Sequence, residues 1–337
     1  MISKIKKAIY LIKKYKIHGD NINFARRYTL DSQKWSSEQI KDESKLIERN
    51  CPVCNTDNKN ILLNTPVYAF VKCTKCGLVY ANKILNGSMI EEFYRDNEIY
   101  QRIWSKSYDI LVKSKDIVQC KSIIDTILKY RSGNNNCLEI GCGHGKLLYE
   151  LKPYFKEVEG VELNEMTSKQ GEKLFDIKIH NDFLENLNLP SNSYDVVILN
   201  QVIEHIDNFD MFKEIYRILK PNGIVYIGCP NADGWSMKLF KDKHIHISHS
   251  HVHENMFNKK SMESFAKNYK FKVKKNGTDN CLDINFIDLI YYFFSKNFIH
   301  RHNYNPILSP ISLVTEKVLG YLLNRTNLLC KLGGAVT

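Results

Sequence analysis

The chain has 337 residues, of which 43% are hydrophobic and 25% are charged, and this composition is typical of a globular protein of about two domains. No run of about 18 uncharged apolar residues occurs that could span a bilayer. We therefore do not expect an integral membrane protein.

The formal net charge of +11 is unevenly distributed: residues 1–48 carry +5, residues 49–130 carry +4, and residues 131–276 and 277–337 carry +1 each. Phosphate contacts supply much of the affinity of proteins for nucleic acids. A nucleic-acid partner is therefore disfavoured for the nearly neutral residues 131–276, and any surface that binds polyanions is expected in the N-terminal third.

Residues 1–48 predict a basic helical segment, because residues 1–17 hold six lysines and no acid among isoleucines at near-helical spacing. Such a helix could contact an anionic membrane surface or an acidic partner, but packing on its own protein is the commoner arrangement. The apolar residues 8–12 are too few for a secretory signal. We expect a cytoplasmic protein, with residues 1–17 as one candidate peripheral contact with a membrane.

Residues 49–80 predict a zinc ribbon. Cys51 and Cys54 form one Cys-X-X-Cys motif, Cys73 and Cys76 form another, and 18 residues separate them. Four thiolates complete a tetrahedral zinc site, so the ion would be structural; a redox dithiol and free thiols are the alternatives. The remaining cysteines show no pairing pattern and are expected to be reduced: Cys120, Cys137, Cys142, Cys229, Cys281 and Cys330.

Residues 81–130 predict a helical linker that could serve as a lid over a cofactor, with Tyr94, Tyr100, Trp104 and Tyr108 among polar residues. Residues 131–276 then alternate short β-rich runs, at 137–140, 157–162, 177–180, 194–199 and 223–228, with segments of helical period. This alternation predicts an α/β domain with a parallel sheet and helices on both faces.

Residues 277–337 predict a helical extension, with an aromatic segment at 284–299 that contains Asp288 and Lys296. A helix buried against the core is favoured for this segment, and contact with a membrane interface is the alternative.

A glycine-rich loop follows the first strand of this domain. Gly141, Gly143 and Gly145 lie in the sequence LEIGCGHG, at a strand-to-helix turn where glycines let the backbone approach a ligand closely. Glu162 ends the next strand, where an acid can accept hydrogen bonds from both ribose hydroxyls. Asp182 follows the third strand. The Gly-X-Gly-X-Gly spacing differs from the dinucleotide motif, and no P-loop is present.

The ordered blocks LEIGCGHG, VEGVELNE, NDF, YDVVILNQVIEHI and RILKPNGIVYIGCPN resemble the class I S-adenosylmethionine-dependent methyltransferase family over about residues 131–276. The resemblance implies a Rossmann-like sheet and S-adenosylmethionine as the methyl donor. It implies that the three glycines line the methionine and ribose portion and that Glu139 holds the methionine ammonium. It further implies that Glu162 binds the ribose, that Asp182 and Phe183 bind and cover the adenine, and that Asn200 and Gln201 flank the methionine end.

The methyl acceptor must be aligned and, where it is a hydroxyl or a carbon acid, must lose a proton. His205 follows the fourth strand and is a candidate base or acceptor contact, although Glu204 and His205 could equally cap and position a helix. Five histidines follow the fifth strand: His244, His246, His249, His251 and His253. Their segment resembles the acceptor lid of the family, so His251 and His253 are candidate acceptor contacts, with a metal site or an exposed surface as alternatives.

A zinc ribbon ahead of such a domain resembles methyltransferases of bacterial polysaccharide and deoxysugar pathways. This resemblance implies transfer of a methyl group to a sugar or sugar-nucleotide hydroxyl or carbon in surface-polysaccharide biosynthesis, with a small-molecule acceptor. An RNA methyltransferase that uses the ribbon and the basic N-terminal third, and a quinone or lipid O-methyltransferase, remain alternatives. Methylation of an exocyclic amine of a nucleic-acid base is disfavoured, because no Asn/Asp-Pro-Pro-aromatic motif follows the fourth strand. Methylation of a pyrimidine carbon through a cysteine nucleophile is disfavoured too, because Cys229 follows the fifth strand and not the fourth.

Overall fold

The computed structural model describes residues 31–32, 34–65, 67–114, 121–234, 237, 252–279 and 335–336. The predicted helices at 1–17 and 284–299, most of the extension at 277–337, and His251 lie outside these residues. So do His244, His246, His249, Cys120, Cys281 and Cys330. Within the described part of the chain, no helix combines the length and apolar character needed to cross a membrane.

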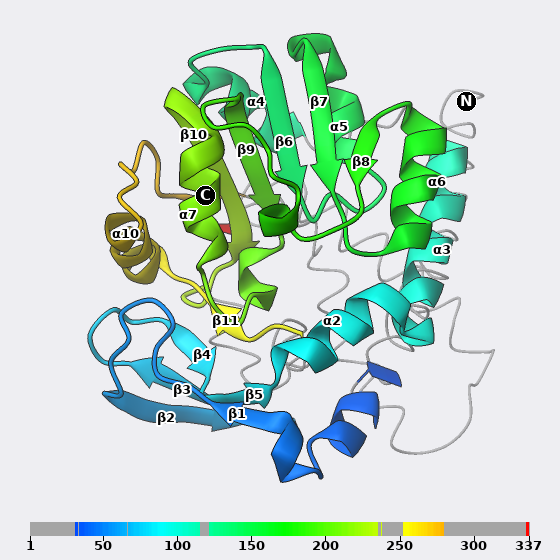
Figure 1. Ribbon diagram of the computed structural model, residues 1–337. Coiled ribbons are helices and arrows are strands. Elements are labelled where there is room, and N and C mark those ends of the chain that lie inside the picture. Colours follow the sequence, from blue (N-terminus) through cyan, green and yellow to red (C-terminus); the bar gives the residue numbers. More distant parts are fainter. Residues whose placement is uncertain are drawn as a thin grey trace, which may run out of the picture.

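A parallel sheet forms the centre of the molecule (Figure 1). Its strands are β6 (Asn136–Ile140), β7 (Glu157–Val161), β8 (Lys178–His180), β9 (Tyr194–Asn200) and β10 (Leu219–Pro230). They lie in the order β10-β9-β6-β7-β8, and each neighbouring pair is parallel. All five predicted strands are confirmed. Two short antiparallel strands extend the sheet beyond β10: β13 (Ala335–Val336) and then β12 (Thr278–Asp279).

Helices cover both faces of this sheet, as the alternating pattern predicts. Successive strand residues point to opposite faces, so Cys137 and Val196 belong to one apolar core and Leu138 and Val197 to the other. The first core includes residues of α4 (Lys121–Tyr130), α5 (Lys146–Leu151) and α6 (Glu165–Phe175). The second includes residues of η3 (Leu184–Asn186), α7 (Met211–Ile218) and α10 (Lys259–Asn268).

A smaller β module lies below the parallel sheet (Figure 1). It contains β2 (Lys59–Asn64), β3 (Ala69–Cys73), β4 (Val79–Ala81) and β11 (Asn255–Met256), in the order β11-β4-β3-β2. Because β11 comes from the segment after the fifth strand of the main sheet, backbone hydrogen bonds join the cysteine-containing part of the chain to the main domain.

Residues 1–48 and 81–130 were both predicted to be helical, but the first segment ends in a strand and the second begins with one. After η1 (Glu43–Lys45), β1 (Leu46–Glu48) pairs antiparallel with β5 (Lys83–Leu85). Helical structure in the second segment begins only at α2 (Gly87–Asp96), where the Asn86 side chain accepts a hydrogen bond from the Met89 amide. The pairing joins residues such as Ile47 and Ile84, which lie 37 positions apart, so local periodicity does not reveal that these segments form strands.

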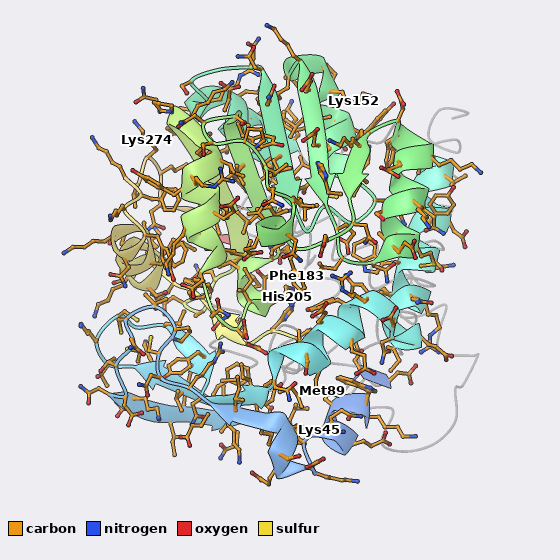
Figure 2. The ribbon with its side chains drawn as sticks, in the orientation of Figure 1. Lys45, Met89, Lys152, Phe183, His205 and Lys274 are labelled. Atoms are coloured by element: carbon orange, nitrogen blue, oxygen red, sulfur yellow. The ribbon has the colours of Figure 1, made fainter. Side chains whose placement is uncertain are left out.

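Helices α2 and α3 (Glu98–Ser114) cross the space between the small module and the carboxyl ends of the parallel strands, and α3 packs on α6 (Figure 1). In the side-chain view, Phe183 and His205 lie in this middle layer (Figure 2). The two helices therefore form one wall of the space in which ligands of open α/β sheets bind.

Candidate active site

A cavity of about 860 Å³ opens at the carboxyl ends of the parallel strands. Most of the proposed cofactor and acceptor residues that the structure describes line it: Gly141, Glu162, Asp182, Phe183, Asn200, Gln201, His205 and His253. Glu139, Gly143 and Gly145 lie outside the lining, although they belong to the same loop and strand as Gly141. The predicted residues thus gather at one edge of the sheet.

The glycine loop adopts a backbone that other residues rarely adopt. Gly141, Gly143 and Gly145 have φ values of +66°, +54° and +77°, in the left-handed region that favours glycine. A Cβ on Gly143 would lie 2.6 Å from the Trp104 ring, and one on Gly141 would lie 2.6 Å from the Val202 side chain. The loop is a close-fitting cradle beside the cavity.

Glu162 stabilises this loop and still faces the cavity. Its two carboxylate oxygens accept hydrogen bonds from the Gly143 and Asn164 amides, each at 3.0 Å. A carboxylate has about four acceptor positions, so two remain for other donors. Burial raises the pKa of Glu162, and the Asn164 and Gly143 amides oppose that shift. The buried Glu162 carboxylate is therefore suited to accept hydrogen bonds from two ribose hydroxyls.

Glu139 is fully buried in β6, and its Oε2 atom has no hydrogen-bond partner among the described residues. Burial, together with the nearby Glu162 charge, raises the pKa of Glu139 well above its ordinary value. A buried acceptor without a donor is unfavourable by about 1–3 kcal/mol, and a ligand ammonium would remove this penalty. These residues therefore fit S-adenosylmethionine.

At the third strand the Asp182 carboxylate is already engaged. It accepts hydrogen bonds from the Asn186 side chain at 3.0 Å, the Phe183 amide at 2.7 Å and Arg95 at 3.2 Å. Asn186 and the Phe183 amide together lower the pKa of Asp182. Arg95, from α2, also lies over the Phe183 ring, 5.3 Å from its centroid. Arg95 is a residue of this site that sequence motifs did not identify.

An aromatic chain on α2 and α3 covers the cavity. Tyr94 and Tyr100 have ring centroids 5.0 Å apart, Tyr100 and Trp104 5.9 Å, and Trp104 and His144 5.3 Å. Tyr94, Tyr100 and Trp104 line the cavity directly. These three residues lie within the lid predicted at residues 81–130. Their spacing along the helices did not predict that Trp104 would contact the glycine loop at Gly143.

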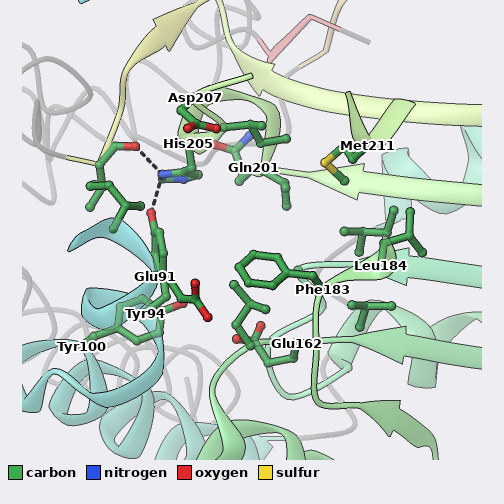
Figure 3. Close-up of a pocket in the computed structure, with 18 of the residues that line it drawn as sticks. Glu91, Tyr94, Tyr100, Glu162, Phe183, Leu184, Gln201, His205, Asp207 and Met211 are labelled. Atoms are coloured by element: carbon green, nitrogen blue, oxygen red, sulfur yellow. Dashed lines mark hydrogen bonds between the residues drawn. The ribbon is translucent and has the colours of Figure 1, made fainter. Parts of the chain in front are cut away.

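His205 lies at the opposite end of the cavity, in η4 (Ile203–His205) after the fourth strand (Figure 3). Its Nδ1 atom is 2.7 Å from the Val252 carbonyl oxygen and 3.0 Å from the Tyr94 hydroxyl. Because a carbonyl can only accept, Nδ1 carries the hydrogen and donates it to the Val252 oxygen. The His253 ring lies 4.7 Å from that of His205. His205 and His253, the two candidate acceptor contacts that the structure describes, thus lie next to each other in the cavity.

Between these ends, Asn200 is the last residue of β9, the fourth strand, and Gln201 follows it. Gln201 has a φ of +59°, unusual for a residue with a side chain. Its amide donates to the Gly228 carbonyl at 2.7 Å, which holds this turn against β10. The turn leads the chain from the carboxyl end of β9 to His205 in η4.

The four predicted zinc ligands come together in the small module. Cys51 and Cys76 have sulfur atoms 3.5 Å apart, as do Cys54 and Cys73, and all four sulfurs lie within 4.8 Å of one another. A tetrahedral ion with zinc–sulfur bonds of about 2.3 Å requires sulfurs about 3.8 Å apart. The cluster therefore fits zinc, and Gly77, at φ +81°, closes the second turn.

Comparisons with known proteins agree with this architecture. Residues 113–276 match a family model described as a methyltransferase domain. A probable S-adenosylmethionine-dependent methyltransferase of Mycolicibacterium smegmatis is 32% identical over 106 residues, which cover 31% of this chain and 41% of that protein. The mitochondrial ubiquinone biosynthesis O-methyltransferase of Rattus norvegicus is 30% identical over 112 residues, 30% of this chain and 32% of that protein.

A solved structure, a SAM-dependent methyltransferase from Archaeoglobus fulgidus, is 20% identical with a TM-score of 0.44, and the match covers 70% of this chain and 98% of that one. The chain spans less than half the length of the two curated relatives named above. Residues 113–276 are thus similar to methyltransferase domains, and the parallel sheet with its helices has the class I S-adenosylmethionine-dependent methyltransferase fold.

Proposed function

We propose that the protein transfers a methyl group from S-adenosylmethionine to a sugar or sugar nucleotide, at a hydroxyl or carbon, in surface-polysaccharide biosynthesis. The observation that carries the proposal is that one cavity is lined both by Gly141, Glu162 and Asp182 and by His205 and His253. A methyl donor and an acceptor bound there would meet in line, as the displacement requires.

When bound, S-adenosylmethionine supplies an electrophilic methyl group on a positively charged sulfur. The protein's part is to bind and orient. Glu139 and Glu162 would hold the ammonium and the ribose, and Asp182 with Phe183 would hold the adenine. The aromatic side chains of α2 and α3 that line the cavity would exclude water from the transfer path. His205 and His253, which line the cavity, are the groups that would contact the acceptor and take its proton.

A hydroxyl-rich acceptor is supported by the polar side chains at the acceptor end. Gln201, Asp207 and Asn208 line the cavity there, together with the two histidines. These groups can donate to and accept from several hydroxyls. The nearly neutral charge of residues 131–276 disfavours a long polyanion as acceptor.

Apolar side chains in the same wall favour a second candidate, a quinone or lipid O-methyltransferase. Ile90, Ile206, Met211 and Val252 line the acceptor side, and the rat relative acts, by its name, in ubiquinone biosynthesis.

Incubation of the zinc-loaded protein with methyl-labelled S-adenosylmethionine and fractionated cell extract distinguishes these functions. Label in the small anionic fraction that holds nucleotide sugars supports the proposal. Label that partitions into organic solvent supports the quinone or lipid acceptor. Label in RNA contradicts both and would direct attention to the basic N-terminal third.

A further inference from the structure

The edge of the main sheet at β10 is paired over only part of its length. β13 lies between β10 and β12 and is antiparallel to both, so that Val336 is level with Cys229 and with Thr278. Neighbouring strands are about 4.8 Å apart, so exactly one strand separates β10 from β12 at this level. Among the described residues, no strand pairs with this edge of β10 before Cys229.

A second cavity, of about 530 Å³, lies along this unpaired edge. Residues 223–227 of β10 line it on one side, and residues 270–275, which lead into β12, line it as well. Continued backward from the pairing of β13, the register places Lys274 level with Val225. The cavity, called the slot below, therefore continues the position of β13 and is one strand wide.

The β10 side of the slot presents backbone hydrogen-bonding groups. The Gly228 carbonyl accepts from the Gln201 amide at 2.7 Å, on the side of β9. Along a strand, the backbone groups of successive residues point alternately to its two neighbours. Those of Val225 and Ile227 therefore point away from β9 and into the slot. Because backbone N–H and C=O groups require partners, an extended chain in the slot could pair with them.

Apolar side chains close the slot above and below the sheet. Met262, Phe265 and Ala266 line it from α10, and Ile127 and Tyr130 line it from α4. The side chains of a strand alternate between the two faces of its sheet. A strand in the slot would therefore bury apolar side chains against these two helices.

The slot is also strongly basic, because its lining holds five lysines and no acidic residue: Lys220, Lys270, Lys272, Lys274 and Lys275. Lys220 is paired with Asp195 at 2.8 Å. Lys270, Lys272 and Lys274 are exposed and form no ion pair with the rest of the described chain. The nearly neutral total charge of residues 131–276 does not reveal this cluster. Charge complementarity favours an acidic occupant.

We propose that the slot binds an extended acidic segment of a partner protein, which adds a strand to the main sheet beside β10. In this mode of recognition, main-chain hydrogen bonds supply the affinity and side-chain contacts supply the specificity. A nucleic acid could meet the same lysines, but it could not complete the backbone ladder of β10. The open strand edge therefore favours a peptide.

This binding site is separate from the site of methyl transfer. The slot shares no lining residue with the cavity that holds Glu162 and His205. Figure 2 places Lys274 at the rim of the molecule, away from His205. The inference therefore stands independently of the methyl acceptor.

The test is binding of a fluorescein-labelled peptide of alternating valine and glutamate to the zinc-loaded full chain, measured by fluorescence anisotropy. A length of about six residues matches a typical strand. We expect saturable binding that is about tenfold weaker or more for the double variant Lys272→Glu with Lys274→Glu. Lys169→Glu with Lys173→Glu is the matched control, because it makes the same charge change at exposed positions of α6 and should bind like the wild type.

Hydrogen exchange measured by mass spectrometry separates strand addition from charge attraction alone. The valine–glutamate peptide should slow the exchange of amides in residues 223–228, whereas a peptide of alternating valine and lysine should neither bind nor protect them. Absence of peptide binding, equal binding by both double variants, or binding without protection of β10 would overturn the inference. Equal binding of oligothymidylate at the same lysines would identify a polyanion surface instead. Self-association of the wild type that the slot variant abolishes would show that a second copy fills the slot, and would also overturn it.

Discussion

Individual carboxylates supply much of the candidate cofactor site, and their hydrogen-bond surroundings differ. Glu139 lies in β6 and Glu162 directly follows the neighbouring β7, yet Glu162 receives two backbone hydrogen bonds and Glu139 Oε2 receives none from the described residues. Glu162 is therefore held in place by the fold itself, whereas the ammonium of the proposed ligand would be a partner for Glu139 Oε2. The position of Glu162 at the end of a strand identified that acid, and the family resemblance implied a role for Glu139, but only the packing shows this difference.

Glu162→Gln is expected to weaken S-adenosylmethionine binding about tenfold to a hundredfold, because a hydrogen bond to a charged group contributes about 1.5–3 kcal/mol. Isothermal titration calorimetry measures the dissociation constant. Asp176→Asn removes the same charge from an exposed helix end and should leave it unchanged. Equal affinity of Glu162→Gln and wild type would contradict the ribose role.

Asp195 anchors the start of β9 through a charge pair. It accepts hydrogen bonds from the Asn135 and Asn136 amides, each at 3.0 Å, and from Lys220 at 2.8 Å. Burial alone raises the pKa of Asp195, but Lys220 and the Asn136 amide outweigh it, so the net pKa lies below the ordinary value of 3.8. The ionised form therefore stabilises the folded state.

Asp195→Asn should reduce the free energy of unfolding at pH 7 by about 1–3 kcal/mol. Since the folded pKa is depressed, this stabilisation is present above pH 3.8 and is lost as the pH falls through the folded pKa. Urea unfolding of both proteins from pH 7 to pH 3 should show their difference shrinking at the acid end. A constant difference would contradict the charge pair, and Asp233→Asn, at an exposed position, is the control.

At the scale of elements, the cysteine turns position strands that reach the main domain. Cys73 ends β3, β3 pairs with β4, and β4 pairs with β11. β11 follows directly after the loop of His253 and Glu254. The metal proposed at the cysteines would therefore hold the acceptor side of the cavity in place from a distance.

Cys73→Ser is expected to remove the zinc and to lower the melting temperature, because a structural zinc ion contributes folding free energy directly. Zinc per chain is measured by elemental analysis, and unfolding by calorimetry. Cys137→Ala changes another buried thiol, in β6, and should retain the zinc. Full zinc content in Cys73→Ser would show that the cysteine cluster does not hold the ion.

At the scale of the whole molecule, Arg49 joins the small β module to the domain of the parallel sheet. Arg49 precedes the first cysteine turn and donates to the carbonyl oxygens of Ala81, Asp207 and Glu254. Its guanidinium also lies 3.3 Å from the buried Glu254 carboxylate. Arg49 therefore connects the β module with η4 and the His253 loop, which together form the acceptor end.

Arg49→Met should destabilise the protein by about 3–5 kcal/mol, because it leaves the Glu254 charge buried without its partner. Adding Glu254→Gln should restore part of this loss, as urea unfolding of the single and double variants would show. Arg102→Met breaks an exposed ion pair with Asp31 and should cost less than about 1 kcal/mol. No recovery in the double variant would mean that Arg49 acts mainly through its backbone contacts.

The sequence by itself determined the five parallel strands, the glycine loop with its acids and the two cysteine motifs. Each depends on local periodicity or on short spacing along the chain. The strands β1 and β5 were expected to be helical, because their pairing partners are distant in sequence. Proposed roles for His251 and for the segments 1–17 and 284–299 remain predictions.

Only the tertiary structure decided which side chains share the cavity. Arg95 and Trp104 reach the cofactor side from α2 and α3, and His253 reaches His205 across 48 positions of sequence. Glu204 was expected to cap or position a helix, and only the structure shows it completely buried in η4, because sequence does not report burial. Such juxtapositions follow from how packed layers meet, which depends on many long-range contacts at once.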